Sequence, residues 1–90
     1  MRFSWDSTKA RKNLQKHGIS FEEAATVFAD PLALITDDVA DPKRCLITGQ
    51  SLIGRVLVTV FVELGHVVRI ISARRATRRE RTHYEEGQET

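Results

Sequence analysis

The feature that most constrains the fold is a run of alternating aliphatic residues between positions 55 and 63. Valine occupies positions 56, 58, 60 and 62, and the residues between them are Leu57, Thr59 and Phe61. Alternate side chains of a β-strand point to opposite faces of the sheet, so this strand is apolar on nearly every position of both faces. Such a strand is predicted to lie in the centre of a sheet, with both of its faces covered.

Further strands are predicted on either side of this one, over residues 32–36, 44–48 and 67–72. The segment Leu64-Gly65-His66 has the length of a hairpin connection between the central strand and the last of these. In residues 67–72, strict alternation predicts Val68, Ile70 and Ser72 on one face and Val67, Arg69 and Ile71 on the other. A short edge strand is expected at residues 3–5.

Helix signals lie before and after this group of strands. Asp6 or Ser7 is suited to cap a first helix that runs to His17, with Gly18 as a left-handed C-terminal cap. Residues 20–23 and 77–80 both have the pattern of a capping box. They predict a second helix that ends at Pro31 and a last helix that continues through Tyr84.

The order of these elements indicates the fold class. Helices that are separated in sequence from an antiparallel meander are typical of an α+β domain. We expect one compact α+β domain over residues 1–90, with N-terminal helices packed on an antiparallel sheet, a C-terminal helix, and a frayed tail at residues 85–90.

Length and composition exclude several classes of protein. A chain of 90 residues supports one modest core. The apolar run 56–62 is far shorter than the roughly 20 residues of a membrane helix, so no membrane association is expected. The N-terminal residues lack the pattern of a secretory signal, which favours the cytoplasm. Cys45 is the single cysteine, which excludes an intrachain disulfide and a multi-cysteine metal site.

Charge is distributed unevenly along the chain, although the formal net charge is only +2. Residues 21–41 carry acidic groups alone, whereas residues 69–84 carry six arginines against one acid, Glu80. Clustered arginines are typical of nucleic-acid binders because the guanidinium group makes paired contacts to phosphate. A solvated basic helix face, or a surface for an acidic protein, remains open as an alternative.

Other motifs are uninformative or absent. The glycines at 49 and 54 do not form a nucleotide-binding loop, and the histidines lack metal-ligand spacing. No metal or cofactor is expected. Within the arginine-rich segment, Glu80 is suited to be either a general base or the capping residue of its helix, and His83 is a candidate acid or base.

The residues that carry a family resemblance extend along nearly the whole chain. They include Phe3-Ser4-Trp5-Asp6, the stretch from Lys9 to Ala24, residues 49–62 and, most specifically, residues 69–84. On these residues the chain resembles the BrnT-type toxins of bacterial type II toxin-antitoxin pairs, in the RelE-like ribonuclease superfamily.

The resemblance implies a compact RelE-like fold and a metal-independent ribonuclease that cleaves RNA and inhibits translation. It also implies a cognate antitoxin of the ribbon-helix-helix class, which neutralises the toxin and binds promoter DNA as part of the complex. A heterotetramer built from two toxin-antitoxin heterodimers is the expected assembly.

The arginine-rich segment and the resemblance together suggest a mechanism in which the RNA 2′-hydroxyl attacks the adjacent phosphate. This reaction needs a base, a cationic clamp and an acid. We expect the clamp in Arg69, Arg74 and Arg79, the base in Glu80, and the acid in His83 or Tyr84. Further contacts to RNA are expected from Arg55, Arg75, Arg78 and Arg81. The alternatives are a basic module that binds nucleic acid without cutting it, and a domain that docks an acidic protein.

Overall fold

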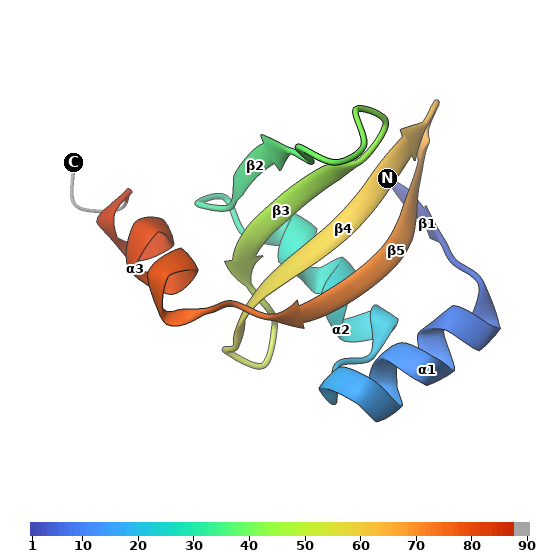
Figure 1. The fold of residues 1–90 in the computed structure, drawn as a ribbon, viewed down its shortest axis with the longest axis horizontal. Helices are drawn as coiled ribbons and strands as arrows, with labels where there is room; N and C mark the ends of the chain where they lie inside the picture. Colours follow the sequence, from blue (N-terminus) through green and yellow to red (C-terminus); the bar gives the residue numbers. More distant parts are fainter. Residues whose placement is uncertain (88–90) are drawn as a thin grey trace.

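A curved, mostly antiparallel sheet forms the centre of the protein in the computed structural model, which describes residues 1–87 (Figure 1). The five strands of this part of the chain have the order β1-β5-β4-β3-β2. The elements are β1 (Arg2–Ser4), α1 (Ser7–His17), α2 (Phe21–Thr26), the 3-10 turn η1 (Val27–Ala29), β2 (Leu34–Asp37), β3 (Cys45–Gln50), β4 (Val56–Leu64), β5 (Val67–Arg75) and α3 (Arg78–Glu86).

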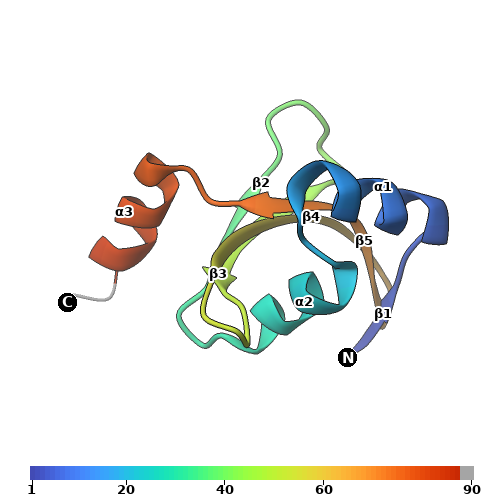
Figure 2. The same ribbon diagram turned by 90° about the horizontal axis from the view of Figure 1, so that it is seen from below.

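The predicted fold class is confirmed by this arrangement. Strands β2 to β5 form an antiparallel meander, and β1 adds to its edge in parallel with β5. Strand β4 lies in the middle of the sheet, as its apolar pattern predicts. Figure 2 shows the sheet arching over α2, so one face is covered by helix and the other faces away from it.

The core fills the space between the helices and the concave face of the sheet. It joins the helical residues Ile19, Phe21, Ala24 and Val27, none of them exposed, to sheet residues that include Ile47, Leu57, Phe61 and Ile70. On β4, Leu57, Thr59 and Phe61 therefore face the helices, and Val56, Val58, Val60 and Val62 face the other way. Helices α1 and α2 cover this face alone, so the prediction that both faces of the central strand are covered is wrong for the face on which Val56, Val60 and Val62 are only partly buried.

Helix caps are formed largely by the residues that the sequence indicates. The Asp6 carboxylate accepts from the backbone N–H groups of Thr8 and Lys9, and Gly18 closes α1 with φ of 69°. Ser20 caps α2 by accepting from the Glu23 backbone N–H. The Glu23 carboxylate accepts hydrogen bonds from Arg55 and Ser51 in place of the Ser20 backbone N–H, so only half of the predicted capping box is formed. The full capping box is formed at Thr77 of α3.

Several predicted boundaries are wrong. Helix α2 ends at Thr26 and continues as η1, and β2 begins at Leu34 because an Asp30 turn holds the preceding backbone. The predicted frayed tail is wrong for Glu85 and Glu86, which belong to α3, and residues 88–90 of that prediction lie outside the described residues.

In residues 1–87 no helix combines the length and hydropathy that a membrane crossing needs.

Strand β5 differs from the sequence prediction in a way that matters for function. It continues to Arg75, and its pairing with β4 shifts between Phe61, which faces Ile70, and Val60, which faces Ser72. Ile71 is therefore an extra residue, a β-bulge. Strict alternation predicted Ser72 on the face of Ile70, and this is wrong because the bulge moves Ser72 and Arg74 to the uncovered face.

We predict that Thr59→Val stabilises the protein. Thr59 is completely buried, and its hydroxyl has no hydrogen-bond partner among the described residues. Valine replaces the hydroxyl with a methyl group of similar volume and so eliminates the unsatisfied polar atom. The free energy of unfolding should therefore rise by about 1 kcal/mol. Urea denaturation measures the change.

The control is Thr36→Val, at an exposed position on the edge strand β2. Its free energy of unfolding should change by less than about 0.5 kcal/mol. A destabilised Thr59→Val protein beside an unchanged control would contradict the prediction.

Candidate functional site

The junction between β5 and α3 holds a closely bonded pair of side chains. Arg74 donates from Nη1 to Oε1 of Glu80 at 2.7 Å and from Nη2 to Oε2 at 3.0 Å. This two-pronged geometry is the strongest that a guanidinium and a carboxylate adopt. The same carboxylate accepts from the Thr77 backbone N–H at 2.8 Å, so Glu80 caps α3 and orients Arg74 at once.

The ionisation of Glu80 follows from these contacts. Hydrogen bonds from Arg74 lower the pKa of Glu80 to about 2, against the opposing effect of partial burial and with help from the Thr77 N–H. The carboxylate is therefore ionised at neutral pH and holds a proton weakly. In this arrangement Glu80 is better suited to orient Arg74 than to accept a proton.

A cleft of about 140 Å³ lies between α3 and the uncovered face of the sheet. Its walls are Glu80 and His83 from α3 and Leu34, Thr36, Leu46 and Thr48 from β2 and β3. Arg74 borders this cleft, because it is bonded to Glu80 and pairs with Val58 on β4, which in turn pairs with Thr48. The fold thus brings Arg74, Glu80 and His83 together.

The outer side of α3 forms a second, shallower hollow. It is lined by Arg78, Arg79, Thr82, His83 and Glu86. His83 therefore borders both the cleft and this hollow, and the exposed guanidinium groups of Arg78 and Arg79 lie next to it. Arg81 is also exposed on α3. A chain of phosphates on this side of α3 would meet several cationic groups.

Two predicted catalytic residues lie away from this group. Arg69 is half-buried beside β1, donates to the Ser4 hydroxyl at 3.4 Å, and is about 15 Å from Arg74 along β5. Tyr84 is only 5% exposed, and its hydroxyl donates to Asp30 Oδ2 at 2.5 Å. Tyr84 thus anchors α3 to the end of η1.

Two predicted RNA-binding arginines also point elsewhere. Arg55 is engaged by Glu23 through both Nε and Nη2 and donates to the Gly18 carbonyl at 3.2 Å. That hydrogen bonding holds the pKa of Glu23 below its usual value. Arg75 is exposed, and its pairing with Leu57 puts it on the helix-covered face, where its charge adds to the lowering of the Glu23 pKa.

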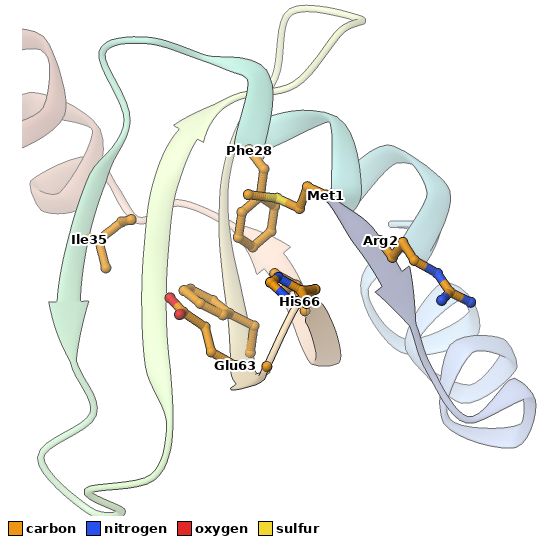
Figure 3. Close-up of a pocket in the computed structure, with 9 residues that line it drawn as sticks. Met1, Arg2, Phe28, Ile35, Glu63 and His66 are labelled. Carbon is orange, nitrogen blue, oxygen red and sulfur yellow. The ribbon is translucent and has the colours of Figure 1, made fainter.

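A further cavity, of about 360 Å³, lies at the opposite end of the sheet (Figure 3). Phe28 and Phe61 meet edge to face in it, with ring centroids 4.9 Å apart, and Glu63 and His66 line it as well. Phe61 is only 1% exposed, which makes it a core residue and a poor platform for a nucleic-acid base. The Arg2 side chain points away from this cavity in Figure 3.

Sequence reasoning missed the partners that hold these elements in place. Asn13 is 7% exposed and bonds to the backbone of Ala73, Asp30 receives Tyr84, and Glu23 receives Arg55. The one signal for Asn13 is its position three residues after Ala10, on the inward side of a helix that is otherwise polar.

Within residues 1–87 no three His, Cys, Asp or Glu side chains are grouped to hold a metal ion.

The fold and the site together define a small α+β protein with a cleft beside its last helix and several arginines around that cleft. A family model described as the ribonuclease toxin BrnT of a type II toxin-antitoxin system matches residues 5–80. The chain therefore belongs to the BrnT family of ribonuclease toxins. The match ends at Glu80, so it includes Arg74 and stops before His83.

Comparison with solved structures supports the fold. The chain is similar to the crystal structure of the Brucella abortus ribonuclease toxin BrnT, with a TM-score of 0.72 and 22% sequence identity. The alignment covers 87% of this chain and 99% of the Brucella chain. A comparison with curated proteins found no match.

We predict that the stabilising effect of Glu80 depends on pH. Its pKa falls from an ordinary value of 4.5 to about 2 on folding, so the ionised form stabilises the fold fully above pH 4.5. This contribution is lost as the pH falls through the folded pKa. Glu80→Gln should lower the free energy of unfolding at pH 7 by about 1 kcal/mol, because the pair is partly exposed and solvent screens it.

Urea denaturation of both proteins at pH 7, 4.5 and 2.5 measures this difference, which should shrink towards the lowest pH. Glu85→Gln, an exposed position of the same helix, is the control. Its difference from wild type should stay below about 0.5 kcal/mol throughout. A Glu80→Gln difference that stays constant with pH would contradict the role of the ion pair.

Proposed function

We propose that this protein is a metal-independent endoribonuclease that inhibits translation in the cytoplasm and is neutralised by a cognate antitoxin. Membership of the BrnT family of ribonuclease toxins supports the general activity. The observation that carries the site is the Arg74–Glu80 pair beside His83 at the mouth of the cleft. These three residues are the proposed catalytic residues.

In the first step an RNA phosphate binds Arg74 and replaces the Glu80 carboxylate as its partner. Arg78 and Arg79 on the outer side of α3, together with the exposed Arg81, hold neighbouring phosphates. Glu80 then loses the contact that most lowers its pKa, and its proton affinity rises towards that of an ordinary glutamate. Substrate binding thus converts a positioning carboxylate into a competent base.

In the second step the RNA 2′-oxygen attacks the adjacent phosphorus while its proton passes to Glu80. The bond from phosphorus to the 5′-oxygen breaks, and His83 donates a proton to that oxygen, since imidazole is the usual proton carrier near neutral pH. The products are a 2′,3′-cyclic phosphate and a 5′-hydroxyl. Arg74 stabilises the negative charge that develops on the phosphoryl oxygens.

The partner in this proposal is a ribbon-helix-helix antitoxin, which assembles with the toxin as a heterotetramer and carries the contact to promoter DNA. The uncovered sheet face supports a protein partner, because Val56, Val60 and Val62 are only partly buried there and Leu64 is 55% exposed. Arg69 and Arg74 lie on the same face by register. An acidic, amphipathic antitoxin segment would match this chemistry and cover the cleft.

We expect the purified protein, free of antitoxin, to cleave end-labelled structured RNA in the presence of excess chelator. Arg74→Ala and His83→Ala should each lower the cleavage rate by about 100-fold, because each removes a group that acts on the transition state. Arg11→Ala, at an exposed arginine of α1, should cleave at the wild-type rate.

Cyclic-phosphate ends on the products would identify the 2′-hydroxyl as the nucleophile. Equal rates for Arg74→Ala and Arg11→Ala would place the active site elsewhere. Salt-sensitive RNA binding with no product from any of these proteins, on free RNA or on ribosomes, would instead identify a binding module.

A further inference from the structure

The backbone of Ala73 in β5 points to an edge of the strand that no neighbouring strand covers in residues 1–87. Ala76 donates its N–H to the Val56 carbonyl of β4 at 2.9 Å. Because the bonding direction alternates along an antiparallel strand, the N–H and C=O of Ala73, three residues earlier, point to the opposite edge. Strand β1 pairs only with residues 67–69 on that edge. The backbone groups of Ala73 therefore lie beyond the end of β1.

The side chain of Asn13 takes the place of the missing strand. Its Oδ1 accepts from the Ala73 N–H at 3.1 Å, and its Nδ2 donates to the Ala73 carbonyl at 2.9 Å. The carboxamide thus supplies the donor and acceptor that a residue of an adjacent strand would supply. Nδ2 also donates to the Ile19 carbonyl at 3.0 Å, which ties the start of α2 to the same point.

Ala73 is the residue directly before Arg74, and it follows the bulge at Ile71. Ala73 is completely buried against the helices, so Arg74 points to the other face, where it meets Glu80. Without the bulge, regular alternation would put Arg74 on the helix-covered face together with Ile70. Holding Ala73 inward therefore also holds Arg74 towards the cleft.

We infer that Asn13 is a positioning residue for the Arg74–Glu80 site, acting through the backbone of Ala73. The inference rests on the proposed function for its effect on RNA cleavage. Its structural part, that Asn13 determines where the Arg74 guanidinium lies, stands apart from any activity. Asn13 is 60 residues from Ala73 in sequence, so this link exists only in the folded protein.

Kinetics of RNA cleavage test the functional part. We expect Asn13→Ala to lower kcat by about 10-fold to 100-fold, since a small misplacement of a catalytic group is enough for such a loss. KM should stay within about threefold, because the exposed arginines of α3 still bind RNA. Val27→Ala, a core substitution in η1, is the control for lost stability, and its kcat should remain within about twofold of wild type.

All proteins are assayed at a temperature where circular dichroism shows them fully folded. Should Asn13→Ala fail to fold, Asn13→Asp replaces it, because its carboxylate still accepts from the Ala73 N–H while both donated bonds are lost. Its kcat should lie below those of wild type and Val27→Ala. Equal kcat values for the Asn13 variant and Val27→Ala would overturn the inference.

Nuclear magnetic resonance of the arginine Nε–H groups and backbone amides tests the structural part without substrate. We expect the Asn13 variant to shift the Arg74 Nε–H signal and to speed exchange of the Ala73 amide by at least about 100-fold, with core amides of β4 unchanged. Unchanged Arg74 and Ala73 signals would overturn the inference even if RNA is cleaved. If wild type does not cleave RNA, the proposed function fails and these signals still decide the role of Asn13.

Discussion

The bulge at Ile71 is the constraint on which the arrangement of the site depends. One extra residue in β5 reverses the faces of all residues that follow, so Ala73 enters the core and Arg74 reaches the cleft. Two hydrogen bonds between the Asn13 carboxamide and the backbone of Ala73 hold Ala73 in this register. Strand β5 then leads directly into the Thr77 cap of α3, so the same short segment sets both the direction of Arg74 and the start of the helix that carries Glu80 and His83.

The arginines of this protein have two different roles in the resting structure. Arg55 and Arg74 are bonded to Glu23 and Glu80, whose pKa values they lower, so much of their charge is already balanced. The exposed arginines of α3 carry positive charge that is available to a polyanion. This division favours a process in which the exposed groups attract RNA first and Arg74 exchanges its carboxylate for a phosphate afterwards.

The two faces of the sheet also have different roles. The concave face forms the core with α1 and α2, and its packing is what a chain of this length needs in order to fold. Within residues 1–87 the other face is covered at one corner, where α3 meets β3, and keeps a row of partly exposed valines. A cleft at the border of an apolar surface is open to the substrate and can also be closed by a protein inhibitor.

The sequence by itself determined the central strand, the meander, a first helix capped at Asp6 or Ser7, the Thr77 cap of the last helix, the arginine cluster and the family. These features depend on local periodicity and on short patterns, which can be read along the chain. Only the tertiary structure decided which candidates meet: Glu80 and His83 line one cleft, whereas Arg69, Tyr84 and Arg55 bind Ser4, Asp30 and Glu23. The physical reason is that a bulge and long-range hydrogen bonds, such as that from Asn13 to Ala73, change side-chain direction without leaving a periodic signal in the sequence.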